Sequence, residues 1–305
     1  MPFEILGIDL GGNTVKSALV DKKGNISDFR KKRTEAKKGL RHVLKSVAEI
    51  VNEYEQGYNI KGVGLSFPGA IDSKKGICVY SPNLNWQNVP IIGELKKTTE
   101  LPLKIINDAD AACLGEKLFL PKDFCTDLIV LTFGTGIGFS YMKNGEIVVN
   151  SKGFSGEAGH ITVRGGLDIL CTCGRYGCWE SKLSKRGIIE LYSHYLDKHD
   201  SKSRFSINSI MQDALKGETT AFKTVSELRF ILADGLANLI NILTPGLILL
   251  GGGIMEAGGD LFLLDLEKTV RELTYKPFRE VEIQKAKAGN NAGIIGAASL
   301  FFDSL

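Results

Sequence analysis

One histidine and three cysteines lie close together near the middle of this chain. They are His160, Cys171, Cys173 and Cys178, in the spacing H-x10-C-x-C-x4-C. Imidazole and thiolate suit zinc, and four of them fill a tetrahedral site with no position left for water. The spacing therefore predicts a structural zinc site. Three other interpretations stay open on spacing alone: ordinary buried cysteines, a disulfide, or a zinc site with no link to activity.

Two glutamates flank these ligands. Glu157 precedes the histidine and Glu180 follows the last cysteine. Because histidine and cysteine already supply four ligands, the carboxylates would be poor additional zinc ligands. We interpret them as acceptors for a hydroxylated molecule held beside the metal.

A strand-end aspartate is the candidate for acid–base chemistry. The apolar residues 103–106 predict a strand that ends at Asn107 and Asp108, and an alanine-rich helix follows at 110–118. In open α/β sheets, ligands bind at this end of the strands. Asp108 could instead serve only as the N-cap of the helix.

A glycine pair joins two predicted strands near the N-terminus. The strands are residues 4–9 and 15–21, and Gly11 and Gly12 lie between them. Glycine lets backbone N–H groups approach a phosphate closely. At the tip, Asp9 could hold Mg²⁺ through water, and Lys16 could supply a positive charge. An ordinary hairpin turn with a surface aspartate would give the same pattern.

Two further glycine turns follow apolar segments. One lies between predicted strands at 127–133 and 139–142, and its similarity to the first turn indicates an internal duplication. The other follows a predicted strand at 247–250, where a nucleoside could lie against bare backbone, or where a plain strand–helix turn could stand. The candidate residues of these turns are Gly134, Thr135, Gly136, Gly252 and Gly253.

Composition bounds the class of protein. A chain of 305 residues forms one large or two medium domains. The net charge of +3 (38 − 35) and the hydrophobic content of 43% give no general argument for nucleic acid or membrane partners. Eight lysines and arginines do crowd residues 30–45. Such a run is typical of the solvated face of a loop and helix, and a nucleic-acid patch is the alternative.

The remaining cysteines indicate a reducing compartment. Cys78, Cys113 and Cys125 are far apart, which fits reduced thiols better than a disulfide framework. The first residues show no basic segment followed by a long apolar one, and no apolar run reaches the length of a membrane span. We expect a soluble, cytoplasmic protein.

Together these motifs resemble the ROK family of sugar kinases, within the actin/hexokinase-like ATPase superfamily. The most specific part is Glu157-x-Gly159-His160 with Cys171-x-Cys173-Gly174-x-x-Gly177-Cys178-x-Glu180. The resemblance covers essentially the whole chain. It implies an α/β fold of two ribonuclease-H-like domains with a cleft between them: an N-terminal smaller domain (1–115 plus 290–305) and a C-terminal larger domain with the zinc site (116–289).

The resemblance also implies an activity. It is the ATP-dependent phosphorylation of a hexose at its 6-hydroxyl, with Asp108 as general base. Sugar-binding positions would be Asn83, Asn107, Asp108, Glu157, His160 and Glu180. ATP and Mg²⁺ would be bound by Asp9, Gly11, Gly12, Asn13, Thr14, Lys16 and the two later glycine turns. His160 would bind zinc with one ring nitrogen and the sugar with the other, and a homodimer or homotetramer would be expected.

The sequence departs from the family pattern at three places. Asn13 stands where a threonine is usual, Phe139 and Ser140 where further glycines are common, and Asp110 where an asparagine is usual. The first two departures could loosen nucleotide binding or alter donor preference. For Asp110 we expect a structural effect only.

Several alternatives remain at this stage. The acceptor could be N-acetylmannosamine, N-acetylglucosamine or fructose. A non-catalytic sugar-sensing protein is the alternative of another class, since the family contains repressors. Those carry a helix-turn-helix region before the first glycine turn, and only eight residues precede Asp9 here, so we expect the kinase.

Overall fold

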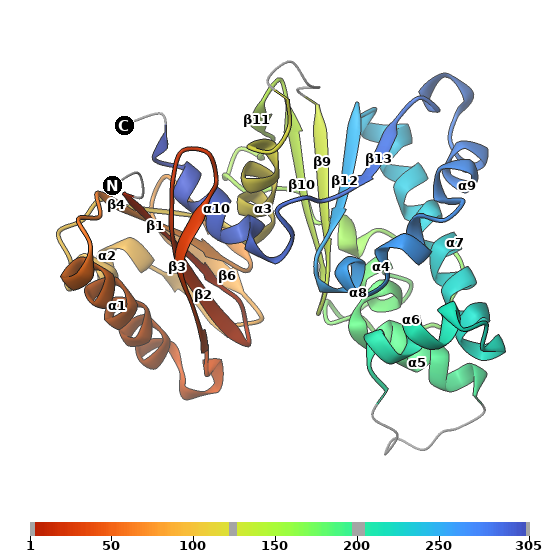
Figure 1. The fold of residues 1–305 in the computed structure, drawn as a ribbon, viewed down its shortest axis with the longest axis horizontal. Helices are drawn as coiled ribbons and strands as arrows, with labels where there is room; N and C mark the ends of the chain where they lie inside the picture. Colours follow the sequence, from red (N-terminus) through yellow and green to blue (C-terminus); the bar gives the residue numbers. More distant parts are fainter. Residues whose placement is uncertain (1–3, 122–126, 197–204, 303–305) are drawn as a thin grey trace.

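Two five-stranded mixed sheets form the two halves of the molecule (Figure 1). The computed structural model describes residues 4–121, 127–196 and 205–302. Helices α3 (Asp108–Lys117) and α10 (Ala292–Ser299) lie between the two sheets and pack against each other. Residues from the end of the chain therefore complete the N-terminal half.

The first sheet has the strand order β3-β2-β1-β4-β8. Its first three strands in chain order are antiparallel to their neighbours, and two parallel strands extend the sheet on the β1 side. Its members are β1 (Ile5–Leu10), β2 (Thr14–Val20), β3 (Ile26–Arg33), β4 (Gly62–Phe67) and β8 (Leu103–Asn107). The predicted strand–glycine–strand unit at residues 4–21 is confirmed.

The second sheet repeats this arrangement with the order β11-β10-β9-β12-β13. Again three antiparallel strands are followed by two parallel strands. Its members are β9 (Leu128–Phe133), β10 (Ile137–Lys143), β11 (Glu146–Ile147), β12 (Leu247–Gly251) and β13 (Glu282–Lys285). The internal duplication that the glycine turns indicated is thus present in the topology.

Helices cover the outer faces of both sheets. The first half carries α1 (Leu40–Gly57), α2 (Ile91–Leu95) and a small sheet of β5 (Ala70–Asp72), β6 (Ile77–Ser81) and β7 (Trp86–Val89). The second half carries α4 (Trp179–Leu183), α5 (Lys185–Tyr195), α6 (Ile207–Leu215), α7 (Thr219–Leu243), α8 (Gly253–Leu263) and α9 (Leu266–Leu273). The buried apolar residues of each half form a large core of their own.

The central helix pair is held at very close range. A Cβ atom at Gly296 would lie 1.7 Å from the carbonyl oxygen of Ala111, and one at Gly115 would lie 2.3 Å from that of Ala292. Only glycine permits this approach. The start of α3, where Asp108 lies, is therefore fixed relative to α10 and the first sheet.

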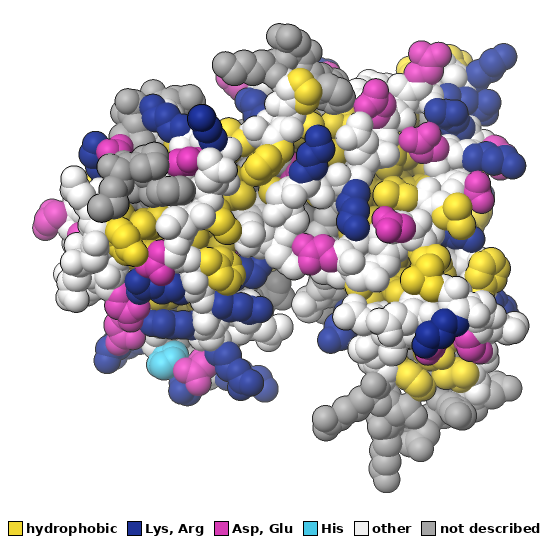
Figure 2. Space-filling view, viewed as in Figure 1, with side chains coloured by type: hydrophobic (Ala, Val, Ile, Leu, Met, Phe, Trp, Pro, Cys, Tyr) yellow, Lys and Arg dark blue, Asp and Glu magenta, His cyan; other side chains and the backbone are white. Residues whose placement is uncertain are grey.

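The basic run at residues 30–45 is a loop and helix as expected, except for its first four residues, which belong to a strand. Residues 26–33 form the edge strand β3. Its lysines and arginines hide the alternation of apolar and polar residues that would predict a strand. Charged side chains are common on edge strands because they oppose pairing with another chain. Neighbouring carboxylates neutralise part of the run, as Arg30 and Lys32 both pair with Glu53 (2.9 Å each), and Figure 2 shows the two charges intermixed.

Three other expectations concern the whole chain. Every cysteine in the described residues is free, whereas Cys125 lies outside them. In the same part of the chain, no helix combines the length and apolarity needed to cross a bilayer. The domain division stays a prediction, and α3 spans its first boundary at residue 115.

Candidate active site

A cavity of about 620 Å³ lies where the two sheets face each other. Most of the predicted site residues line it. They are Gly11, Gly12, Asn83, Asn107, Asp108, Gly134, Thr135, Gly136, Glu157, His160, Glu180, Gly252 and Gly253. The other predicted residues lie outside its wall: Asp9, Asn13, Thr14, Lys16, Cys171, Cys173 and Cys178. Residues as distant in sequence as Gly11 and Gly253 thus meet at one site.

Asn107 caps helix α3. Its side-chain oxygen accepts hydrogen bonds from the backbone N–H of Ala109 (2.8 Å) and Asp110 (3.1 Å). Its amide nitrogen donates to the carbonyl of Gly69 at 2.9 Å. The interpretation of Asp108 as a mere N-cap is therefore wrong, because the preceding residue has that role.

Asp108 has an unusual environment for a carboxyl group. Burial raises its pKa to about 7, and the nearby negative charges of Asp9 and Glu157 act in the same direction. A hydrogen bond from the Ala109 N–H (2.9 Å) opposes the shift. A carboxyl group with a pKa near 7 suits proton transfer at neutral pH, since it is both available and basic enough.

Asp9 and Lys16 form a charged pair behind the first glycine turn. Their closest N–O distance is 3.5 Å. Asp9 also accepts a hydrogen bond from Ser66 (2.8 Å), and the Lys16 ammonium donates to the carbonyl of Asn290 (2.9 Å). The lysine thereby connects the first sheet with the segment that leads into α10.

The second glycine turn is supported by side chains and backbone from the neighbouring helices. Glu180 accepts a hydrogen bond from the Ile137 N–H at 3.0 Å, and Gly134 accepts one from the Lys185 N–H at 2.9 Å. Among the described residues, apart from the adjoining ones in the chain, no heavy atom lies within 4 Å of the position that a Cβ atom would take at Gly134 or Gly253. Backbone in both places is open to a ligand.

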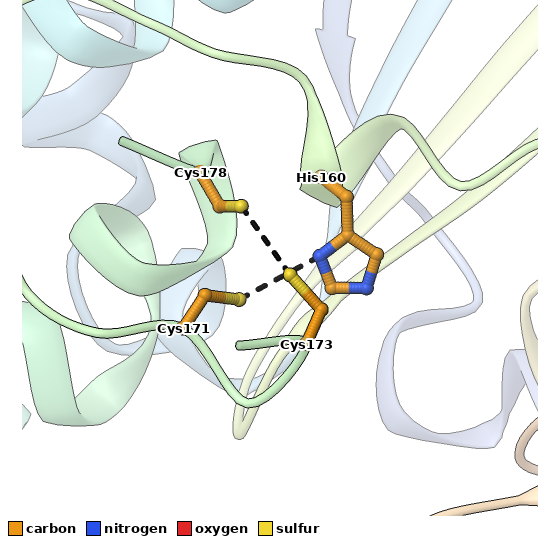
Figure 3. A group of neighbouring side chains, drawn as sticks. All are labelled: His160, Cys171, Cys173 and Cys178. Carbon is orange, nitrogen blue, oxygen red and sulfur yellow. Dashed lines mark hydrogen bonds between the residues drawn. The ribbon is translucent and has the colours of Figure 1, made fainter. Parts of the chain in front are cut away.

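The four predicted metal ligands converge (Figure 3). Their donor atoms all lie within 4.8 Å of one another. The Sγ atoms of Cys173 and Cys178 are 3.6 Å apart, and Cys171 Sγ is 3.6 Å from His160 Nδ1. Zinc–sulfur bonds of about 2.3 Å in a tetrahedron place sulfur atoms about 3.8 Å apart. The residues present therefore fit a four-coordinate metal such as zinc.

His160 belongs to both the metal group and the cavity. Its Nδ1 faces the thiols, while the other ring nitrogen points away from them (Figure 3). The ring also lines the cavity. A metal at Nδ1 would hold the ring in one tautomer and orientation, with Nε2 left for another partner.

The cavity is acidic. The carboxylates of Asp108, Asp110, Glu157 and Glu180 line it, and no lysine or arginine is among its described lining residues. Burial raises the pKa of Glu157; His160 opposes this shift, and the charge of Glu180 adds to it. A polyanionic ligand would therefore need cations of its own to enter.

Several parts of the wall were not predicted as site residues, and two of them bear on the acceptor side. Thr172, between two metal ligands, lines the cavity and donates a hydrogen bond to Glu180 at 3.2 Å. The segment 150–156 also contributes Asn150, Gly153, Phe154, Ser155 and Gly156. Its polar, glycine-containing composition just before Glu157 was the available signal, but that composition is equally typical of an ordinary surface loop.

Known proteins resemble this chain over its whole length. The family model described as "ROK family" matches residues 5–304. The glucokinase of Thermotoga maritima is 31% identical over 98% of this chain and 97% of its own length. That of Halalkalibacterium halodurans is 30% identical over 97% and 94%. The xylose repressor of Caldicellulosiruptor bescii is 28% identical over 99% of this chain but 78% of its own length.

Solved structures give the same result for the fold. A ROK family glucokinase from Streptomyces griseus, in complex with glucose and AMPPNP, superposes with a TM-score of 0.82 at 27% identity, covering 97% of this chain and 98% of that one. The ROK hexokinase of Thermus thermophilus gives 0.81 at 25% identity over 99% of both chains. The predicted fold class is confirmed, and the chain belongs to the ROK family.

Proposed function

We propose that this chain is an ATP-dependent sugar kinase that phosphorylates a hexose at its 6-hydroxyl, with Asp108 as the general base. Family membership and the two glucokinase relatives support the enzyme class. One observation supports the mechanism most strongly. Asp108, whose pKa is about 7, lies in a cavity lined by the glycine turns of both sheets.

The proposed step needs little from the protein beyond positioning. Asp108 accepts the proton of the sugar hydroxyl while that oxygen attacks the γ-phosphorus of ATP. The bond between the γ-phosphorus and the oxygen of the leaving ADP breaks. Because phosphoryl transfer depends on alignment and charge stabilisation, one carboxylate within hydrogen-bond reach of the nucleophile is enough.

The sugar would lie among amide, carboxylate and imidazole groups. We assign this role to Asn83, Asn107, Glu157, His160 and Glu180, all of which line the cavity. Carboxylates accept hydrogen bonds from hydroxyls, and amides both donate and accept. His160, Cys171, Cys173 and Cys178 would hold zinc, which in a filled coordination sphere supplies a structural cross-link.

The triphosphate would lie along the three glycine turns. Gly12, Thr135 and Gly136 would offer backbone N–H groups or a hydroxyl. The N–H groups of Gly11 and Gly134 already donate within their turns, to the carbonyls of Thr14 and Gly136 (2.9 Å each), so these glycines would contribute close approach of the backbone. Gly252 and Gly253 would approach the nucleoside. No lysine or arginine is among the described residues of the cavity wall, so a bound Mg²⁺ would supply the positive charge that the phosphates need there. We place Asp9 as its ligand through water, with Asn13, Thr14 and Lys16 around the same turn.

Glucose is the proposed acceptor because glucokinases of 30% and 31% identity match almost the entire chain. N-acetylmannosamine, N-acetylglucosamine and fructose are the competing acceptors. Sugar sensing without turnover is the competing class, favoured by the similarity to a xylose repressor.

The test is ATP consumption by the zinc-loaded protein with glucose, mannose, fructose, N-acetylglucosamine or N-acetylmannosamine. We expect sugar-dependent ADP formation with glucose preferred. Preference for another sugar would contradict glucose as the acceptor but would still support a sugar kinase. Thermal stabilisation by a sugar without any turnover would contradict the kinase and support the sensor.

A further inference from the structure

A buried carboxylate lies two residues after the proposed base. Asp110 is 5% exposed and lies in the first turn of α3. The hydroxyl of Ser140 donates a hydrogen bond to its Oδ1 at 2.7 Å. The hydroxyl of Ser155 lies 2.7 Å from Oδ1 and 2.6 Å from Oδ2. One side chain thus connects three separate segments.

No basic side chain forms an ion pair with Asp110 in the part of the chain that the structure describes. Burial raises its pKa, and the two serine hydroxyls oppose this shift. A buried carboxylate that depends on two hydroxyls is costly to leave unpaired. Its hydrogen bonds therefore restrict where the two serines can lie.

The three connected segments all belong to the cavity. Helix α3 begins with Asp108, and β10, which carries Ser140, continues from the second glycine turn. Ser155 belongs to the segment 150–157, which we name the acceptor loop. Its residues in the cavity wall are Asn150, Gly153, Phe154, Ser155, Gly156 and Glu157.

The acceptor loop has mainly local hydrogen bonds of its own. Asn150 accepts bonds from the backbone N–H groups of Lys152 (2.8 Å) and Phe154 (3.2 Å), and its own N–H donates to the Phe154 carbonyl (2.8 Å). These bonds close a turn without attaching it to a sheet or helix. Gly153 and Gly156 add conformational freedom. The Ser155–Asp110 contact is what attaches this loop to α3.

We propose that Asp110 and Ser155 are positioning residues that hold the acceptor loop, and with it Glu157, in register with Asp108. This inference rests on the proposed function, in which Glu157 binds the sugar and Asp108 activates it. A mobile loop would weaken sugar binding, because ordering the loop on binding costs free energy that offsets the contacts with the sugar. Nucleotide binding would change less, since the glycine turns do not depend on Ser155.

Two serine variants provide a matched test. Ser155→Ala removes the bond between the loop and Asp110, whereas Ser140→Ala removes the other hydroxyl from the same carboxylate and leaves the loop attached. We expect Ser155→Ala to raise the sugar KM about tenfold, with kcat and the ATP KM within about twofold of wild type. Ser140→Ala should raise the sugar KM much less, and Ser155→Thr should restore it.

Hydrogen exchange supplies a second readout that needs no activity. Backbone amides of residues 150–157 should exchange faster in Ser155→Ala than in wild type or Ser140→Ala. An active Ser155→Ala variant with an unchanged sugar KM, or unchanged exchange in the loop, would overturn the inference. If wild type phosphorylates no sugar, the proposed function fails, and the exchange rates alone decide whether Asp110 and Ser155 hold the loop.

Discussion

The sheets of the two halves have their strands arranged in the same way, but the two halves supply different functional side chains. Each sheet consists of three antiparallel strands followed by two parallel strands, with a glycine turn between the first two strands in chain order. The first half supplies Asp9, Lys16 and Asp108. The second half supplies the four candidate metal ligands together with Glu157 and Glu180. In our proposal the first half performs the proton transfer and contributes Asn83 and Asn107 to the acceptor, while the second half contributes Glu157, His160 and Glu180.

The two hairpin turns also differ in their support. In the first, Thr34 donates a hydrogen bond to the Gly11 carbonyl (2.6 Å), so the neighbouring chain after β3 holds the turn. In the second, Glu180 and Lys185 from α4 and α5 perform this role. A duplicated backbone can thus offer N–H groups on both sides of a cavity while its surroundings diverge.

The largest expected effect comes from the first half. Asp108→Asn should lower kcat by about 10²- to 10⁴-fold, because the amide cannot accept the proton of the hydroxyl. The sugar Kd should stay within a few-fold of wild type, since an amide of the same shape still forms hydrogen bonds. Steady-state kinetics and calorimetric titration would measure both. Near-normal turnover would exclude Asp108 as the base.

Protonation of Asp108 at low pH should lower the rate nearly as much as the Asp108→Asn substitution. Asp108 must be deprotonated to act as a base, and its pKa is about 7. Below that pH, kcat/KM for the sugar should fall about tenfold for each pH unit, and above it the rate should reach a plateau. The residual kcat/KM of the Asp108→Asn variant should not show this fall at low pH. A wild-type rate that is constant from pH 8 to 5 would contradict the assignment.

Loss of the metal should affect the second half selectively. Cys173 is the exposed member of the ligand group, so Cys173→Ser removes a ligand with little change in packing. We expect lower zinc content by mass spectrometry and a sugar KM raised more than tenfold, with a smaller rise for ATP. Zinc returned to chelator-treated wild type is the control. Equal effects on sugar and ATP would show that the metal does not serve the acceptor side specifically.

The glycine turns should show the smallest effect, and it should be similar in both halves. A Cβ atom at Gly12 would lie 3.6 Å from Asn83, and one at Gly134 would lie more than 4 Å from every described residue outside its immediate neighbours in the chain. Alanine at either position should therefore leave the fold intact and raise the ATP KM several-fold, because the methyl group takes the space of a phosphate. Gly57→Ala, with equally open space in α1, is the control. An unchanged ATP KM in one variant would remove that turn from the nucleotide site.

Glycine patterns made much of this site predictable. Apolar runs on either side of Gly11-Gly12 and Gly134 predicted both hairpins, because few other local sequences combine two buried strands with side-chain-free backbone. The spacing from His160 to Cys178 predicted the metal ligands, which the structure brings together. These motifs lie within short stretches of the sequence, so they can be recognised without knowledge of the fold.

The features that were missed depend on contacts across the fold. Strand β3 was hidden because its side chains face solvent at a sheet edge. The N-cap of α3 was ambiguous because asparagine and aspartate cap equally well, and only the bonds of Asn107 decide. Asp110 and Ser140 were noted as separate departures from the family pattern, yet they form one hydrogen bond. Thr172 gave no signal beyond its place between two cysteines.

The central claim is phosphoryl transfer from ATP to the 6-hydroxyl of a hexose. Phosphorus-31 NMR of a reaction with glucose and ATP tests it most directly, with 6-deoxyglucose as the matched acceptor. We expect ADP and a hexose 6-phosphate in equal amounts with glucose, and neither product above the sugar-free rate with 6-deoxyglucose. Phosphate on another hydroxyl, or equal ADP formation with both sugars, would contradict it.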